Sequence, residues 1–322
     1  MILLQDVNGF FLENFYNKIL MMKIGVKKIL HYMSIHPSNW IRDICVHTGY
    51  YGISFYHKYV YYIERRHWPD FKHPKDFSEH LLAAMSKPSF TKYAPYADKV
   101  KVRDYIQSKG LGDCLLDIYG VWEDARDIDF VALPEKFALK PNNGSGGHFF
   151  CKDKSKINKE LIIKQLNDAL LMVKNEKAFK FEPHYAKIPP LIYCEELIDT
   201  GTDAWPVDYK FTCVHGKICD VFVSVERDTG CTKYCTLDVD YYPLPYTREE
   251  YLPKSIPPKP KHFERMKEIA KILSKDFECV RVDLYEYKDR VFFSELTFSP
   301  WGGFMYSYNQ NGLDEIGEAF NE

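Results

Sequence analysis

Two short apolar runs near the C-terminus, residues 280–285 and 291–298, place the strongest constraint on the fold. In each run, apolar residues recur with the period-two pattern of a β-strand. The turn-like pair Lys288 and Asp289 separates the two runs. The pattern therefore predicts a β-hairpin, with Val280, Val282 and Leu284 on one face of its first strand.

Polar residues share the other face of this predicted hairpin. Arg281 and Asp283 are two positions apart on the first strand, and Glu295 and Thr297 are two apart on the second. Two carboxylates on adjacent strands, beside an arginine and ahead of a Gly-Gly turn, could hold Mg²⁺ on a polyphosphate. The alternative is a half-buried hairpin whose polar residues face water, and the hairpin alone favours that alternative.

The composition excludes several classes of protein. With 322 residues and a formal charge of −2, the chain is not a strongly basic protein, and no nucleic-acid partner is expected. The sequence lacks a run of about 18 apolar residues and a signal-peptide pattern, so neither a transmembrane helix nor secretion is expected. The nine cysteines show no paired zinc pattern, which favours a reduced, cytoplasmic setting with mostly inert thiols.

Residues 1–62 are expected to form a mainly helical N-terminal extension. Phe11, Phe15, Ile19 and Met22 recur at roughly helical spacing. This spacing suits an amphipathic helix that lies on a membrane or on a partner enzyme. The alternative, a helix packed on the main body of the protein, is favoured.

A glycine-rich loop lies between two predicted strands, residues 137–140 and 148–151. Its glycines, Gly144, Gly146 and Gly147, free the backbone to present N–H groups to an anion, with Lys140 at the end of the first strand. The loop could fold over ATP phosphates. The alternative is a plain hairpin turn, because Asn-Gly is a strong turn signal.

A lysine follows a predicted helix cap upstream of this loop. Asp98 is a natural N-cap, which would place Lys99 in the first helical turn, with Gly110 as the stop. A lysine there opposes the helix dipole. Lys99 is therefore either a solvated surface residue or a phosphate ligand that tolerates a poor position.

The rest of the chain predicts an alternation of strands and helices. Helices are expected at residues 158–173 and 261–275, the second burying Phe263, Met266, Ile269, Ala270 and Leu273. Strands are expected at residues 191–198, and at 209–218 with a turn at His215-Gly216, continuing through 219–225.

The order of these motifs resembles that of ATP-grasp enzymes, and most of all the TupA-like (teichuronopeptide-biosynthesis-type) ATP-grasp family. The resemblance covers about residues 64–306. It rests on the segments 73–79, 97–103, 133–140, 143–147, 194–197, 208–211, 280–285 and 294–300.

The resemblance implies an α+β ATP-grasp fold, in which two α+β lobes with antiparallel sheets grip ATP. The N-terminal extension lies outside it. The expected division is 1–62 for the helical extension, 63–132 for an N-terminal subdomain, 133–200 for a central lobe with the glycine-rich loop, and 201–322 for a C-terminal lobe with the hairpin.

The resemblance also implies the ligands of ATP and Mg²⁺. The phosphate ligands would be Lys99, Lys140, Gly144, Ser145, Gly146 and Gly147. The adenine contacts would come from Glu195, Glu196 and Leu197. The ribose ligand would be Asp208, with Asp203 as second choice. The Mg²⁺ ligands would be Asp283 and Glu295, with Thr297 standing where many relatives have asparagine, which puts a second metal site in question.

Catalytic roles follow from the same resemblance. Arg281 would steady the transferred phosphate, and Gly302 and Gly303 would offer backbone N–H groups to the reacting carboxylate. Lys210 would either reach the γ-phosphate or pair with a nearby carboxylate. Further candidates for sugar or acceptor contact are Trp205, Arg227, Trp301 and Tyr306.

The resulting hypothesis is an ATP-dependent carboxylate–amine ligase that forms an amide through an acyl phosphate. The resemblance suggests small-molecule or glycan carboxylate and amine substrates, such as an amino acid joined to a uronic acid of a capsule or cell-wall polysaccharide. A cytoplasmic protein, peripheral to the membrane if the extension binds there, is expected. The alternatives are a kinase that acts on a sugar hydroxyl and a non-catalytic ATP-binding scaffold.

Overall fold

A computed structural model describes residues 41–322, apart from 43, 46–47, 145, 176–180, 202–205 and 226–231. Several predictions lie outside the described residues. They concern the amphipathic helix that contains Phe11, Phe15, Ile19 and Met22, the phosphate ligand Ser145, the alternative ribose ligand Asp203, and the acceptor contacts Trp205 and Arg227.

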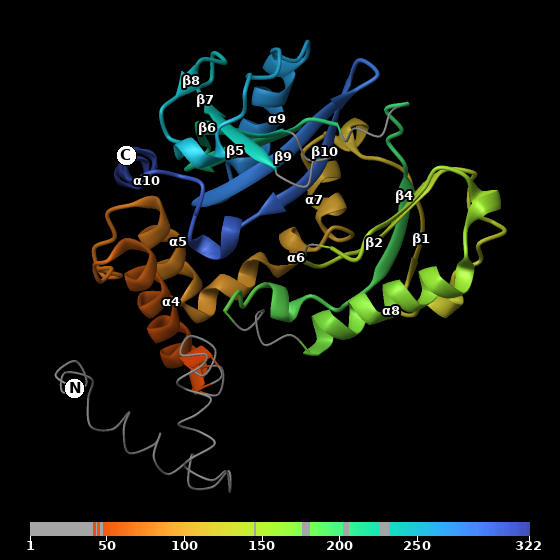
Figure 1. Ribbon diagram of the computed structural model, residues 1–322, viewed down its shortest axis with the longest axis horizontal. Coiled ribbons are helices and arrows are strands. Elements are labelled where there is room, and N and C mark those ends of the chain that lie inside the picture. The colour runs from red at the N-terminus through yellow and green to blue at the C-terminus, as the bar shows by residue number, and fades with distance from the viewer. Residues whose placement is uncertain are drawn as a thin grey trace, which may run out of the picture.

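The smaller of two lobes is built on a four-stranded antiparallel sheet (Figure 1). Its strand order is β1 (Ile118–Trp122), β4 (Ile192–Glu196), β2 (Phe137–Pro141) and β3 (Phe149–Cys151). The segment 63–132 therefore contributes a strand, β1, to the lobe that was expected at 133–200. Strands β2 and β3 flank the glycine-rich loop, so the predicted strand–loop–strand unit is confirmed.

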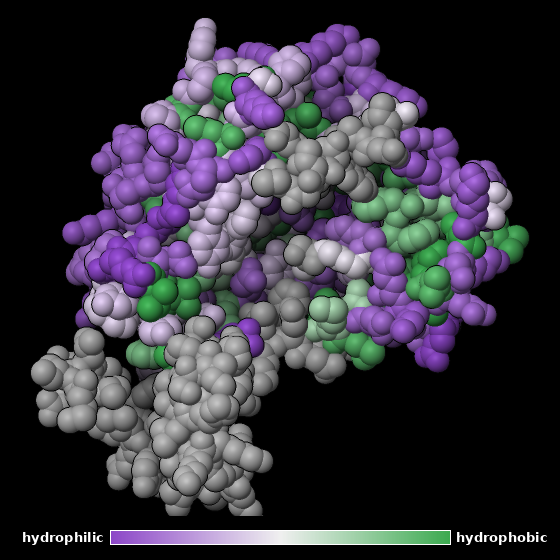
Figure 2. Space-filling view, in the orientation of Figure 1, coloured by the Kyte–Doolittle hydropathy of each residue, from purple (hydrophilic) through white to green (hydrophobic). Residues whose placement is uncertain are grey.

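One long helix, α8 (Lys159–Asn175), packs against this small sheet. It buries Ile162, Leu166 and Leu170 in the apolar core of the lobe, which confirms the predicted helix. Leu161 belongs to the same apolar spacing but is 63% exposed. Figure 2 shows apolar side chains on this lobe, at the right of the view, within a mostly hydrophilic surface.

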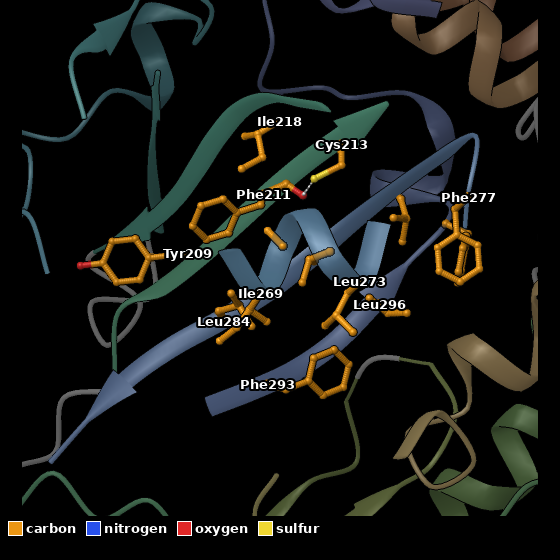
Figure 3. Close-up of a cluster of buried hydrophobic side chains, with 14 of the residues drawn as sticks. Tyr209, Phe211, Cys213, Ile218, Ile269, Leu273, Phe277, Leu284, Phe293 and Leu296 are labelled. Carbon is orange, nitrogen blue, oxygen red and sulfur yellow. Dashed lines mark hydrogen bonds between the residues drawn. The ribbon is translucent and has the colours of Figure 1, made fainter. Parts of the chain in front are cut away.

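The larger lobe is built on a six-stranded antiparallel sheet. Helix α9 (Phe263–Ser274) covers one face and buries all five predicted residues (Figure 3). They pack on strand residues such as Phe211 and Leu284. The strand order is β10 (Arg290–Thr297), β9 (Cys279–Tyr287), β5 (Asp208–Val214), β6 (Lys217–Val225), β7 (Lys233–Leu237) and β8 (Pro243–Leu244).

Both predicted turns of this sheet are confirmed. Lys288 and Asp289 connect β9 to β10 with φ angles of 46° and 58°, and His215 and Gly216 connect β5 to β6 with 49° and 78°. Consecutive positive φ angles give the twist that two-residue hairpin turns require. A register shift before Glu295 then places that residue opposite Asp283.

Helices α5 (Phe77–Met85) and α10 (Gln310–Glu318) contribute to a second apolar cluster, with Phe222 and Tyr308. Helix α5 begins after Asp76, whose carboxylate accepts a hydrogen bond from the backbone N–H of Glu79 at 2.8 Å. Asp76 is thus the residue that caps this helix.

The described end of the N-terminal extension packs on the main body. Helix α4 (Gly49–Arg65) donates a hydrogen bond from the Tyr61 hydroxyl to Asp76 at 2.7 Å. Its His57 is buried and contacts Ser86 and Phe181. This part of the extension therefore follows the favoured alternative. No described helix combines the length and the apolar character of a membrane span.

Two short helices, α6 (Ala94–Ala97) and α7 (Val102–Ser108), lie between the two sheets (Figure 1). The Asp98 carboxylate accepts hydrogen bonds from the N–H groups of Val100 and Lys101, as a capping residue does. Helix α7 begins only at Val102, so the prediction that Lys99 occupies its first turn is wrong. Lys99 lies instead in the turn between α6 and α7.

Candidate active site

Three neighbouring strands of the large sheet bring the predicted hairpin residues together with Lys210. Lys210 of β5 lies opposite Asp283 of β9, and Asp283 lies opposite Glu295 of β10. Arg281 and Thr297 form the next opposed pair. Because directly opposed residues of an antiparallel sheet point to the same face, these five side chains form one polar cluster.

Asp283 is the centre of this cluster. Arg281 donates to both of its carboxylate oxygens, with Nε–Oδ1 and Nη2–Oδ2 distances of 2.7 Å each. The Nζ of Lys210 lies 2.6 Å from Oδ2 and also binds Asp208. Asp283 is fully buried, and burial raises its pKa while Arg281 and Lys210 lower it. The two cations therefore stabilise a carboxylate that burial alone would disfavour.

Glu295 is surrounded by cations from two parts of the chain. Its carboxylate lies 3.3 Å from the Nζ of Lys99 and 3.5 Å from the Nη2 of Arg281, and it accepts a hydrogen bond from Thr297 at 3.2 Å. Burial acts to raise the pKa of Glu295, but Lys99, Arg281 and Lys210 lower it to about 2. Glu295 is therefore ionised, as a metal ligand must be.

The small lobe contributes a second ion pair. Lys140 of β2 binds Glu195 of β4, and both side chains are mostly buried. Glu196 is exposed at the end of β4, where its backbone N–H donates to Asp117 at 2.9 Å, and Leu197 follows it. The predicted adenine-binding segment thus lies where β4 leaves the sheet.

Lys99 connects the glycine-rich loop to the polar cluster. Its Nζ donates to the carbonyl of Gly144 at 2.9 Å, and its backbone N–H donates to Asn142 at 3.0 Å. Gly144, Gly146 and Gly147 all have positive φ angles, which only glycine adopts readily. The loop therefore lies against the lysine that contacts Glu295.

A cavity of about 630 Å³ lies between this loop and α8. Leu161 and Met172 line it, together with Lys164 and Asp168. The cavity is not lined by Lys140, Glu195 or any residue of the polar cluster. The polar cluster, rather than this cavity, is the candidate active site, because it gathers the charges that suit a polyphosphate.

The donor set fits a Mg²⁺ ion that is shared with a polyphosphate. Within the described residues, no three His, Cys, Asp or Glu side chains gather as a metal site. Mg²⁺ in nucleotide sites is usually held by one or two carboxylates together with substrate phosphates. Asp283 and Glu295 can provide the carboxylates. The ion pairs of the cluster join three cations, Lys99, Lys210 and Arg281, to three carboxylates, Asp208, Asp283 and Glu295. A bound divalent cation would therefore leave a net positive charge on these six groups, which favours an anion.

The predicted Gly302–Gly303 turn lies just beyond β10. Trp301, Gly302 and Gly303 have φ angles of 53°, 62° and 87°. The N–H of Gly302 donates to the carbonyl of Ser299 at 3.0 Å, so it is used inside the turn. A Cβ on Gly303 would lie 2.8 Å from a side-chain carbon of Leu82, so packing as well as φ requires glycine there. Both predicted N–H donors therefore lie within the turn Pro300–Gly303.

The sequence patterns did not single out Asp220, which lies beside the cluster. It is opposite Thr212 on β5, and its carboxylate accepts a hydrogen bond from the Tyr308 hydroxyl at 2.6 Å. Burial raises the pKa of Asp220 to about 6, while Tyr308, Thr212 and Arg281 oppose the rise. The sequence did offer one sign of this site. Asp220 is a carboxylate in a largely apolar strand, two positions from Phe222 and therefore on the same face.

The chain matches the family model described as "TupA-like ATPgrasp" over residues 79–321. A comparison with curated protein sequences gives no match. Among solved structures, the D-alanine–D-alanine ligase from Helicobacter pylori is 16% identical, with a TM-score of 0.40, and the match covers 70% of this chain and 58% of that one. The ligase of the same name from Bacillus anthracis is 15% identical, with a TM-score of 0.39 and coverages of 69% and 62%.

The structure of ATP-grasp ligase PsnB complexed with a precursor variant, Mg and ADP is 14% identical, with a TM-score of 0.41 and coverages of 76% and 66%. The chain thus spans about three fifths of the length of the two alanine ligases. The family model, by contrast, matches well over half of this chain. The protein therefore belongs to the TupA-like ATP-grasp family, and it has the α+β fold of two antiparallel-sheet lobes that the resemblance predicted.

Proposed function

We propose that the protein is an ATP-dependent carboxylate–amine ligase. ATP phosphorylates a carboxylate to an acyl phosphate, an amine attacks the acyl carbon, and phosphate leaves as the amide forms. One observation carries the proposal: Lys210 and Arg281 converge on Asp283, directly opposite Glu295, which Lys99 contacts. Phosphoryl transfer depends on positioning and charge neutralisation, and this cluster offers both.

The charges of the cluster suggest a role for each residue. Asp283 and Glu295 would hold Mg²⁺, which neutralises charge on the polyphosphate when it is bound. Lys99 and Lys140 would bind phosphate oxygens, with the glycine-rich loop above them. Arg281 would contact the transferred phosphoryl group, because its guanidinium lies beside both proposed metal ligands, Asp283 and Glu295.

Lys210 and Asp208 complete the proposed nucleotide contacts. Lys210 lies between two carboxylates, which raise its pKa against the effect of burial, so it keeps its positive charge. A charged Lys210 beside Asp283 would reach a terminal phosphate. Asp208 would bind the ribose, and Glu195, Glu196 and Leu197 would contact the adenine. Gly303 would present its N–H to the reacting carboxylate.

The family resemblance supports a glycan context for the reaction. We expect an amino acid, or a similar amine, to be joined to a uronic acid of a capsule or cell-wall polysaccharide or its precursor. For this role we expect a cytoplasmic enzyme. Residues 1–40 would be the part that contacts a membrane or an assembly complex.

The test is an assay of the purified full-length protein with ATP, Mg²⁺ and panels of acid–amine pairs. ADP and an amide should form together, and hydroxylamine should trap the acyl phosphate as a hydroxamate. Asp283→Asn/Glu295→Gln should abolish both products. ADP formation with a phosphoester that resists hydroxylamine would replace the ligase by a sugar kinase. Full biological function of the double variant would instead indicate a scaffold.

A further inference from the structure

Two arginines from distant parts of the chain hold carbonyls of the same short segment, residues 304–308, just after the Gly302–Gly303 turn. Arg65 is the last residue of α4, and Arg248 precedes the short helix Glu249–Tyr251. Each is half-buried and uses its guanidinium to hold a backbone carbonyl. The Nη2 of Arg65 donates to Phe304 at 3.1 Å, and the Nε of Arg248 donates to Tyr308 at 3.0 Å. We refer to Arg65 and Arg248 as the arginine pair.

The guanidinium groups of the arginine pair keep N–H donors for an anion. In the described part of the chain neither guanidinium forms an ion pair with a carboxylate, and each has N–H groups beyond the one that it donates. Burial and the charge of Arg248 lower the pKa of Arg65, and its acidic neighbours Asp76 and Glu64 only partly offset this. Like charges near one another at half-buried positions repel, and an anion bound by both would reduce the repulsion.

Aromatic side chains gather at the segment whose carbonyls the two arginines hold. Trp301 is 38% exposed and lies edge-on to Tyr234, with ring centroids 5.5 Å apart. The ring centroids of Tyr306 and Trp301 are 6.4 Å apart, and the Tyr306 ring stacks on Phe304. The carbonyl of Phe304 accepts the hydrogen bond from Arg65. Tyr251 lies 6.0 Å from Tyr234 and three residues after Arg248. Half-exposed aromatic rings of this kind offer apolar faces to a ring-shaped ligand.

The register of the sheet relates this aromatic group to the polar cluster. Tyr234 of β7 lies opposite Ser224 of β6, and Ser224 lies opposite Asp208 of β5. Neighbouring strands are about 4.8 Å apart, so the backbones of Tyr234 and Asp208 are about 10 Å apart, and both side chains are on the same face of the sheet. That distance suits a substrate of one or two sugar rings whose reacting carboxylate lies at the cluster.

We propose that the arginine pair and these aromatic residues form a substrate subsite, which binds a carboxylate or phosphate carried on a sugar-sized group. The proposal rests on the proposed function, because it assigns the subsite to the acid or amine substrate of that reaction. Guanidinium groups match both anions in shape and charge. Arg65 lies outside the segment that matches the family model, so the N-terminal helix α4 supplies part of the specificity.

The experiment measures ligand binding to the full-length protein by calorimetry, without ATP. The probes are D-glucuronate, glucose 6-phosphate and, as the uncharged match, glucose. At least one anion should bind tenfold or more tightly than glucose. Arg65→Ala and Arg248→Ala should each weaken that binding by about ten- to a hundredfold, the loss expected for hydrogen bonds to a charged group. Tighter binding of D-glucuronate would identify the bound anion as a carboxylate, and tighter binding of glucose 6-phosphate would identify it as a phosphate.

Two controls separate binding from folding and from catalysis. Arg290→Ala also removes a guanidinium that holds a carbonyl, that of Asp113, and should leave anion binding unchanged. Arg65→Lys and Arg248→Lys keep the charge and should restore part of the affinity. MgATP binding, followed with a fluorescent nucleotide, should be unchanged in every variant and shows that each one folds.

The subsite is overturned if glucose binds as well as both anions, or if both alanine variants bind the anion as the wild type does. A parallel loss of anion and MgATP binding would also overturn it, because the arginines would then only hold the fold together. Failure of the subsite and failure of the proposed function can be told apart. Failure to form an amide with any substrate pair would reject the ligase, whereas anion binding would still be measured.

Discussion

Arg281 binds both carboxylate oxygens of Asp283, its neighbour two positions along the same strand, with two hydrogen bonds of 2.7 Å. Alternation along β9 places both side chains on the face that carries Glu295. Since Asp283 is fully buried, its charge depends on this pairing and on Lys210. The positions of arginine and carboxylate are therefore coupled, and removal of either one changes the other.

Replacement of Arg281 tests this coupling. Arg281→Ala should lower kcat for ADP release by about a thousandfold, the scale expected for an arginine that stabilises phosphoryl transfer. Arg281→Lys keeps the charge but loses the paired hydrogen bonds, so its activity should be intermediate. Arg290→Ala, on the exposed tip of the same hairpin, is the matched control and should retain kcat. Wild-type kcat in Arg281→Ala would remove Arg281 from the proposed mechanism.

The glycine-rich loop allows a comparison of two adjacent glycines. A Cβ on Gly147 would lie 2.5 Å from the Cβ of Ala169 on α8, whereas a Cβ on Gly146 meets nothing within 4 Å. Their φ angles are 68° and 99°, so both alanine variants carry backbone strain, of about 1–3 kcal/mol. Only Gly147→Ala should also displace the loop from α8, and its KM for MgATP should rise more.

A second substitution separates the clash from the strain. Gly147→Ala/Ala169→Gly removes the atom that the new Cβ would meet, so the KM for MgATP should return to that of Gly146→Ala. The measurement is the KM for MgATP in all three variants, with thermal unfolding as a check on folding. Equal KM values for Gly146→Ala and Gly147→Ala would show that contact with α8 does not position the loop.

Local patterns were sufficient for the elements whose side chains repeat regularly. Alternation between Val280 and Leu284 predicted β9, and the helical spacing from Phe263 to Leu273 predicted the buried face of α9. The same alternation placed Arg281 and Asp283 together, because residues two apart on a strand must share a face. These predictions needed only the geometry of a single strand or helix.

Contacts between distant segments could not be obtained in this way. Nothing in the residues around Lys99 shows that it reaches Glu295, since that contact depends on how the turn after α6 packs against β10. The arginine pair could not be predicted from local patterns, because Arg65 and Arg248 contact the same segment only when α4 packs on the main body. Leu161 shows a further limit, because helical spacing cannot tell which edge of an apolar stripe stays exposed.

The buried imidazole of His57 should make stability depend on pH. Burial lowers the pKa of His57 from 6.5 to about 4, and its Nε2 lies 3.0 Å from the Phe181 carbonyl, which can only accept a hydrogen bond. The neutral ring with a proton on Nε2 is therefore the folded form. As pH falls from 6.5 to 4, the unfolded chain binds a proton that the folded chain does not. The free energy of unfolding should then decrease by up to about 3 kcal/mol.

Denaturant unfolding at a series of pH values between 4 and 7 measures this effect. His57→Gln should flatten the slope, because glutamine can donate to Phe181 without titrating. Some pH dependence of the free energy of unfolding should remain in this variant, because burial also lowers the pKa of His184, to about 3. His73→Gln makes the same substitution at an exposed position and serves as the control. Equal slopes for the wild type and His57→Gln would contradict the prediction.

Thr297 tests how the metal site is built. Its hydroxyl accepts a hydrogen bond from Arg281 at 3.1 Å and donates one to Glu295 at 3.2 Å, so it orients both groups. Thr297→Val keeps the shape but removes both bonds, and should lower kcat for ADP release by about tenfold, from the loss of one or two hydrogen bonds to charged groups. Thr297→Asn instead offers a carbonyl oxygen, which Mg²⁺ binds readily, so half-maximal activity should require less Mg²⁺. Titration of ADP release with Mg²⁺ measures both effects. An unchanged Mg²⁺ requirement in Thr297→Asn would place residue 297 outside the metal's reach and leave its hydroxyl with an orienting role alone.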